Sequence, residues 1–152
     1  MKENKKRYDE INGQLASLIG DETNEIANMA NASSLLYHGL EEINWAGFYL
    51  LEGEELVLGP FQGKTACIRI PMGKGVCGCA VRDKEIKCVK DVELFPGHIA
   101  CDCASRSEIV LPIWKDGKIY GVLDIDSPVI GRFQEEDQEG LLEFVKILEK
   151  KL

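Results

Sequence analysis

The sequence has no apolar run near the roughly 18 residues that a membrane-spanning helix requires. Its longest apolar run, Ile109 to Trp114, is short and is interrupted by a proline. The first ten residues also lack the apolar segment of a secretory signal, because most of them are charged or polar. We therefore expect no membrane association and no secretion, and we expect the chain to work in the reducing cytoplasm.

Basic side chains are too few and too scattered for a nucleic-acid binder. The chain has 18 Lys and Arg against 26 Asp and Glu, which gives a net charge of −8. Binding to a phosphate backbone needs a patch or stripe of positive charge. We expect no nucleic-acid partner, and a small molecule or another protein instead.

No linker, internal repeat or low-complexity tract divides the chain. A chain of this length can bury about 70% of its unfolded surface without disulfide bonds. We therefore predict one domain over residues 1–152.

The periodicity of apolar residues predicts helices at both ends of the chain and hairpin-linked strands between them. Helices are expected at Lys5 to Ile19, Thr23 to Leu40, Gly75 to Arg82 and Gln134 to Lys151, the second capped by Asp21 or Thr23. Strands are expected at Asn44 to Glu52, Glu54 to Gly59, Ala66 to Pro71, Ile86 to Val89, Ser107 to Lys115 and Lys118 to Ser127. This order predicts an α+β fold: a central antiparallel sheet, helices from both termini packed on it, and a long loop, Lys90 to Arg106, covering a small-molecule pocket.

The chain has six cysteines, and in a reducing compartment these are more often catalytic, redox-active or metal-binding than structural. Three of them lie in patterned segments. Cys67 falls on a predicted strand, Cys77 in the first turn of a predicted helix and Cys101 in the long loop. The other three, Cys79, Cys88 and Cys103, are expected to be small buried hydrophobic residues.

Five segments, taken in order, closely resemble the free methionine-(R)-sulfoxide reductases, which are stand-alone enzymes of the GAF-domain fold. The segments are Asn44-Trp45-Ala-Gly-Phe-Tyr49, Gly73-Lys-Gly-Val-Cys77-Gly, Phe95-Pro-Gly-His98-Ile-Ala-Cys101-Asp, Ser107-Glu108-Ile-Val-Leu-Pro112-Ile and Gly121-Val-Leu-Asp124-Ile-Asp126-Ser. Each is weak alone. Their order is specific, with Cys67, Cys77 and Cys101 spaced by ten and twenty-four residues as in that family.

The resemblance implies a substrate, a reductant and roles for the thiols. It implies free methionine-(R)-sulfoxide as the substrate, thioredoxin as the reductant, and no metal ion or organic cofactor. It also implies that Cys101 attacks the substrate, with Cys67 favoured over Cys77 as the resolving thiol. The sequence leaves the oligomeric state open, a homodimer included.

The residues favour the same chemistry on their own. Reduction of a sulfoxide needs a soft nucleophile at sulfur, a proton for the departing oxygen and a second thiol that resets the first. Cys101 is the better nucleophile candidate because loops expose thiolates whereas buried cysteines are inert. Either Cys67 or Cys77 could resolve the sulfenic acid. His98, in the same loop as Cys101, could bond to backbone or tune a cysteine, and both interpretations stay open.

Three carboxylates are candidates for substrate binding and proton transfer. Asp124 and Asp126 lie two apart on a strand, so their side chains share a face. A two-residue turn at Asp116-Gly117 would place Glu108 opposite Ile125, with its side chain facing away from both aspartates. A three-residue loop at the same turn would place Glu108 opposite Asp124. Because the family's pocket uses all three, we predict the longer loop, with Gly117 left-handed.

Crowded carboxylates cannot all ionise easily, so one of the three should hold a proton at neutral pH. That proton can go to the sulfoxide oxygen, and the remaining negative charge can hold the substrate ammonium. Trp45 and Tyr49 would form an apolar wall around the methyl-sulfur end.

Two alternatives belong to other classes of protein. One is a non-catalytic GAF-type sensor that binds a small molecule, which would not explain three spaced cysteines beside carboxylates. The other is a zinc site formed by Cys77-x-Cys79 and His98-x-x-Cys101-x-Cys103, for which Cys-x-Cys spacing is poor. We therefore expect no metal site.

Overall fold

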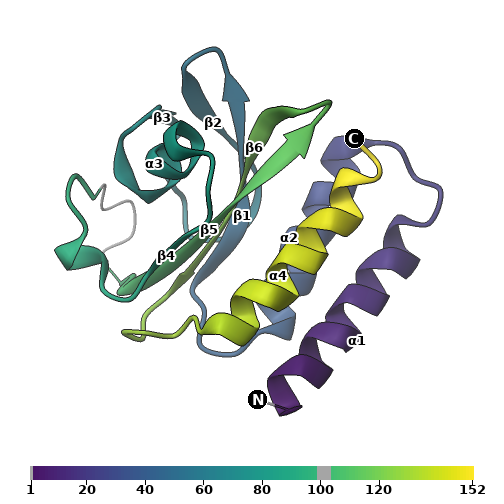
Figure 1. Cartoon of the computed structure of the whole chain (residues 1–152). Helices are drawn as coiled ribbons and strands as arrows, with labels where there is room; N and C mark the ends of the chain where they lie inside the picture. Colours follow the sequence, from purple (N-terminus) through teal and green to yellow (C-terminus); the bar gives the residue numbers. More distant parts are fainter. Residues whose placement is uncertain (1, 99–103) are drawn as a thin grey trace.

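The computed structural model describes residues 2–98 and 104–152, and it confirms the predicted α+β fold. Six antiparallel strands form one sheet in the order β3-β2-β1-β6-β5-β4 (Figure 1). The strands are β1 (Trp45–Glu52), β2 (Glu55–Gly63), β3 (Arg69–Pro71), β4 (Lys87–Val89), β5 (Ser107–Lys115) and β6 (Lys118–Ser127). The helices are α1 (Lys2–Ile19), α2 (Glu25–Gly39), α3 (Gly75–Asp83) and α4 (Glu135–Glu149), with a 3-10 turn, η1 (Val92–Leu94).

Helices cover both faces of the sheet, and the two faces differ in what covers them (Figure 1). On one face α2 and α4 lie against the central strands, and α1 packs on these two helices. On the other face α3 contacts β5 and β6. The helices from the two ends of the chain thus share one face and leave the opposite face to α3 and the loops. None of the described helices is long and apolar enough to cross a membrane.

Strand alternation separates the core into two apolar clusters. In β1, Ala46 and Phe48 belong to the cluster on the helix side, whereas Trp45 and Tyr49 belong to the cluster beside α3. Successive side chains of a strand point to opposite faces, so one apolar run serves both cores. The face beside α3 receives the candidate pocket residues of this strand.

The β5–β6 hairpin differs from the prediction. Its turn has two residues, because Asp116 and Gly117 both have positive φ and Lys115 pairs with Lys118. The predicted three-residue loop is therefore wrong.

A β-bulge compensates for the short turn. Ile113 pairs with Gly121 and Trp114 with Ile119, which leaves Tyr120 as an extra residue in β6. Beyond the bulge, Glu108 pairs with Asp126 and stands on the face of both aspartates. The predicted grouping of the three acids is correct in geometry, but the bulge produces it.

Two smaller predictions are corrected by local hydrogen bonds. The cap of α2 is Asn24, whose side chain accepts from the backbone N–H of Ala27 at 2.9 Å, and not Asp21 or Thr23. Cys67 lies in the loop before β3 and not on a strand, because β3 begins only at Arg69.

Candidate functional site

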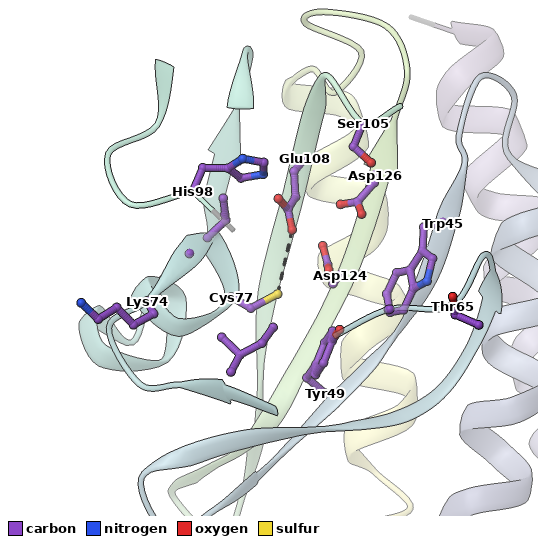
Figure 2. A pocket seen from close by; sticks show the side chains of 14 residues that line it. Trp45, Tyr49, Thr65, Lys74, Cys77, His98, Ser105, Glu108, Asp124 and Asp126 are labelled. Atoms are coloured by element: carbon purple, nitrogen blue, oxygen red, sulfur yellow. Dashed lines mark hydrogen bonds between the residues drawn. The ribbon is translucent and has the colours of Figure 1, made fainter. Parts of the chain in front are cut away.

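A pocket opens on the sheet face that carries α3 (Figure 2). It encloses about 540 Å³ of empty space, including open solvent at its mouth. Strands β1, β3, β5 and β6, the loops before β3 and β5, the start of α3 with the residue before it, and the loop after η1 all contribute to it. Its lining residues are Trp45, Tyr49, Thr65, Ala66, Ile70, Lys74, Gly75, Val76, Cys77, His98, Ser105, Glu108, Asp124 and Asp126.

The three predicted carboxylates lie together in this pocket. Glu108 comes from β5, and Asp124 and Asp126 come from β6. Figure 2 shows them between Cys77 and His98 on one side and the aromatic residues on the other. Glu108 and Asp124 are buried, with 8% and 5% of their surface exposed. The sheet register brings the three acids together, because Glu108 pairs directly with Asp126.

Burial changes the protonation of these acids. Desolvation raises the pKa of Glu108 well above its usual range, and the nearby Asp124 raises it further. Desolvation, followed by the charge of Asp126, likewise raises the pKa of Asp124. A carboxyl group in such surroundings is a proton donor near neutral pH, whereas an exposed carboxylate is not.

Cys77 points into the same cluster from the first turn of α3. Its Sγ lies 3.9 Å from Oε2 of Glu108. Gly78 lets this turn approach the chain before it, because a Cβ at position 78 would come within 2.6 Å of the Pro71 carbonyl oxygen. Desolvation, and then Asp124 and Glu108, raise the pKa of the Cys77 thiol well above its usual value. Since the thiolate is the reactive form, this environment suppresses the reactivity of Cys77.

Trp45 and Tyr49 form the predicted aromatic wall. Their rings stack with centroids 5.9 Å apart, and Phe61 stacks on Trp45 at 5.2 Å. Between them, Gly47 gives Phe61 room, because a Cβ at this position would overlap it. Both polar ends donate to backbone carbonyls: Nε1 of Trp45 to Lys64 O at 3.1 Å, and the Tyr49 hydroxyl to Cys67 O at 2.8 Å.

The described cysteines differ in their oxidation state. Cys67 is half-buried and disulfide-bonded, whereas Cys77, Cys79 and Cys88 are free thiols. The predicted nucleophile Cys101 lies outside the described residues, as does Cys103.

The expectation of burial is right for Cys79 and wrong for Cys88. Cys88 lies in the middle of the edge strand β4, where its Sγ contacts the Phe133 carbonyl oxygen at 3.6 Å but the residue as a whole stays exposed.

Several lining residues were missed by sequence reasoning. Ser105 is buried and accepts a hydrogen bond from Nδ2 of Asn44 at 3.1 Å. Asn44 is the first residue of one motif of the family resemblance and Lys74 lies inside another, so the sequence did mark both positions. Thr65 and Ala66 carried none, because tertiary contacts decide the path of their loop. His98 does line the pocket, and burial lowers the pKa of its imidazole, which favours the neutral form.

Within the described part of the chain, one group of side chains could hold a metal ion. The ligand atoms of Cys77, Glu108 and Asp124 all lie within 4.8 Å of one another. Of the two cysteines in the alternative zinc pair, Cys77 points toward Glu108 and Cys79 contacts the Gly73 carbonyl oxygen at 3.5 Å through its Sγ. The pocket as a whole combines buried acids, which favour a cation, with an apolar wall and the amino end of a helix.

Comparisons with known proteins point to one family. The GAF domain family matches residues 14–152. The Escherichia coli protein named free methionine-R-sulfoxide reductase is 57% identical over 95% of this chain and 88% of its own length. A Staphylococcus aureus structure titled fRMsr in complex with substrate has a TM-score of 0.92 at 56% identity, and covers 95% of each chain. A free methionine-R-sulfoxide reductase from Neisseria meningitidis, with its substrate, has a TM-score of 0.91 at 47% identity, over 95% of this chain and 87% of the other.

Proposed function

Since this chain belongs to the free methionine-R-sulfoxide reductases of the GAF domain family, we propose that it reduces free methionine (R)-S-oxide to methionine. The observation that carries this proposal is the pocket in which Glu108 and Asp124 are buried opposite Trp45 and Tyr49. A single GAF-like catalytic domain, residues 1–152, would do this in the cytoplasm.

The pocket can accommodate each end of a free amino acid. The ammonium group would lie against Asp124 and Asp126, and the methyl-sulfur end against Trp45 and Tyr49. The start of α3 lines the opposite wall, and the first amides of a helix lack intrahelical acceptors and favour an anion. The substrate carboxylate would lie there. A peptide bond would remove both charged ends, which explains a preference for the free amino acid.

The first half of the reaction uses one thiol and one acid. The thiolate of Cys101 attacks the sulfoxide sulfur, and the carboxyl group of Glu108 protonates the oxygen. Methionine leaves and the oxygen stays on Cys101 as a sulfenic acid. The raised pKa of Cys77 supports this assignment, because its thiol would stay protonated beside the acids.

The second half resets the thiol without a metal ion or cofactor. The Cys67 sulfur attacks the sulfenic sulfur, the S–O bond breaks, and water leaves as the disulfide forms. The disulfide-bonded state of Cys67 supports its role as resolving cysteine, with Cys77 as the second choice. Thioredoxin would then reduce the disulfide by dithiol exchange.

Methionine release from purified protein tests the function. Free methionine-(R)-sulfoxide should be reduced with dithiothreitol or thioredoxin, and the S-epimer, an N-acetylated sulfoxide and a peptide-bound sulfoxide should not. Binding of the R-epimer without turnover would support the alternative of a GAF-type sensor. Comparable turnover of the N-acetylated compound would contradict the placement of the ammonium group. Light scattering on the same sample tests whether the chain forms a homodimer, which we also propose.

A further inference from the structure

The loop that carries Cys67 is held by the two aromatic side chains of the pocket wall. Residues 64–68 have no regular secondary structure and connect β2 to β3. Nε1 of Trp45 donates to the Lys64 carbonyl at 3.1 Å, and the Tyr49 hydroxyl donates to the Cys67 carbonyl at 2.8 Å. Both donors therefore bond directly to the backbone of this loop.

The donors themselves stand on a rigid support. Trp45 and Tyr49 are each 2% exposed, and they belong to β1, which pairs with β2 on one side and β6 on the other. Stacking against each other and against Phe61 fixes the ring orientations further. Because the strand and the rings are fixed, the two hydrogen bonds hold the loop in place against the sheet.

From these contacts we propose that Tyr49 and Trp45 are positioning residues for Cys67, in addition to forming the wall of the substrate pocket. This rests on the proposed function. Disulfide formation requires the two Cα atoms to lie within about 4.4–6.8 Å, so a small displacement of the Cys67 backbone removes it from reach. The Tyr49 hydroxyl would position the resolving residue Cys67, and the Tyr49 ring would contact the substrate.

The step affected is the second half of the reaction. The Cys101 sulfenic acid and the Cys67 thiol give a disulfide and one water, with an S–S bond formed and an S–O bond broken. Because the Tyr49 ring also lines the substrate pocket, the loss of its hydroxyl is expected to slow disulfide formation more than the first methionine release. Loss of one neutral hydrogen bond should slow disulfide formation roughly 2- to 10-fold.

Tyr49→Phe is the test, with rapid-quench measurement of both halves in a single turnover. Methionine release reports the first half, and mass spectrometry of trapped sulfenic acid and disulfide reports the second. Disulfide formation that is slowed more strongly than methionine release supports the proposal. Unchanged disulfide formation overturns it, and so does equal slowing of both halves, because the hydroxyl would then serve the pocket as a whole.

Tyr120→Phe is the matched control. Its hydroxyl is also a hydrogen-bond donor, to Glu25 of α2 at 2.5 Å, and the residue packs against the helix-side cluster away from the pocket. This variant loses the same group and should form its disulfide at the unaltered rate. A similar delay in Tyr120→Phe would mean that general loosening of the fold is responsible, which also overturns the proposal.

A second oxidant separates this proposal from the proposed function. Hydrogen peroxide converts a thiol to a sulfenic acid and water, so disulfide formation at Cys67 can be followed without methionine sulfoxide. If the unaltered protein releases no methionine, the proposed function fails. The delay of Tyr49→Phe after peroxide treatment would still decide whether Tyr49 positions Cys67. Trp45→Phe, which removes the second donor, should give a delay of the same kind.

Discussion

The two faces of the sheet are built from the same strands and have opposite chemistry. In β6, Leu123 and Ile125 face the helices and are fully buried in an apolar core. Asp124 and Asp126 alternate with them and face the pocket, where Glu108 of β5 joins them. Burial of acidic groups costs free energy, whereas burial of leucine and isoleucine gains it. The apolar burial on the helix face thus stabilises the fold and offsets the free-energy cost of the buried acids on the pocket face.

A buried acid on the helix side shows how such a group is stabilised when it has no catalytic task. Asp137 accepts hydrogen bonds from the Tyr8 hydroxyl at 2.7 Å and from the backbone N–H of Gln134 at 2.8 Å. It also forms an ion pair with Arg132 at 3.1 Å. Glu108 and Asp124 are instead desolvated and lie beside other acids, and both causes raise the pKa and favour the protonated forms.

The largest effect is expected at the thiols that act in the pocket. Cys101→Ser should abolish even the first methionine release, because no thiolate remains to attack the substrate. Cys67→Ser should release one methionine per enzyme and then stop, since the sulfenic acid is not resolved. Quantification of methionine per enzyme in the absence of reductant checks both. A stoichiometric burst in Cys101→Ser that is absent in Cys77→Ser would reassign the nucleophile.

The next effect separates the acids by role. Glu108→Gln should lower kcat by about 10²- to 10⁴-fold, because an amide cannot deliver the proton. Asp124→Asn or Asp126→Asn should mainly raise KM, since the ammonium contact is present in ground and transition states alike. Steady-state kinetics with free methionine-(R)-sulfoxide measure all three. Near-native kcat/KM in every one of them would show that the acids do not take part.

The neighbour of Asp124 on the other face should behave in the opposite way. Leu123→Ala removes buried apolar volume from the helix-side core, which typically costs about 2–5 kcal/mol of stability. At a temperature where the variant stays folded, its KM should match that of the unaltered protein. Urea denaturation measures the loss of stability, and kinetics below the transition supply the comparison. A large KM change in Leu123→Ala would mean that the two faces are not independent.

The smallest effect concerns the pH dependence of stability. Folding raises the pKa of Glu108 and Asp124, so their contribution to stability is present below their unfolded pKa values, near 4, and is lost as pH rises through the folded values. The double variant Glu108→Gln/Asp124→Asn should therefore gain stability relative to the unaltered protein as pH rises. Urea midpoints between about pH 4 and pH 8 test this sign. A difference that is constant with pH would show that the two carboxyls are not shifted.

Sequence periodicity predicted the two layers well, because alternation in β1, β5 and β6 is local information. Strands β5 and β6 begin and end where the pattern placed them. The pattern could not reveal the bulge at Tyr120, which lies next to Gly121, where β6 closely approaches the backbone of Tyr49.

The loop of Cys67 was mispredicted for a similar reason. The pattern of its apolar residues is typical of a strand, but side chains of β1 donate hydrogen bonds to the backbone carbonyls of the loop. Tertiary hydrogen bonds of this kind leave no trace in local periodicity. The aromatic and acidic pocket residues, in contrast, were found by their strand alternation together with the family resemblance.

The bulge at Tyr120 lets β6 accommodate one extra residue while the acids of both strands stay on the same face. A regular hairpin with the same sequence and the same two-residue turn would pair Glu108 with Ile125, and the acids of the two strands would then point to opposite faces. Deletion of Tyr120 would instead remove the bulge and leave Ile113 opposite Gly121 and Glu108 opposite Asp126. Changes in length by one residue should therefore be tolerated at the bulge or at the exposed turn, and not in the regularly paired part of the hairpin.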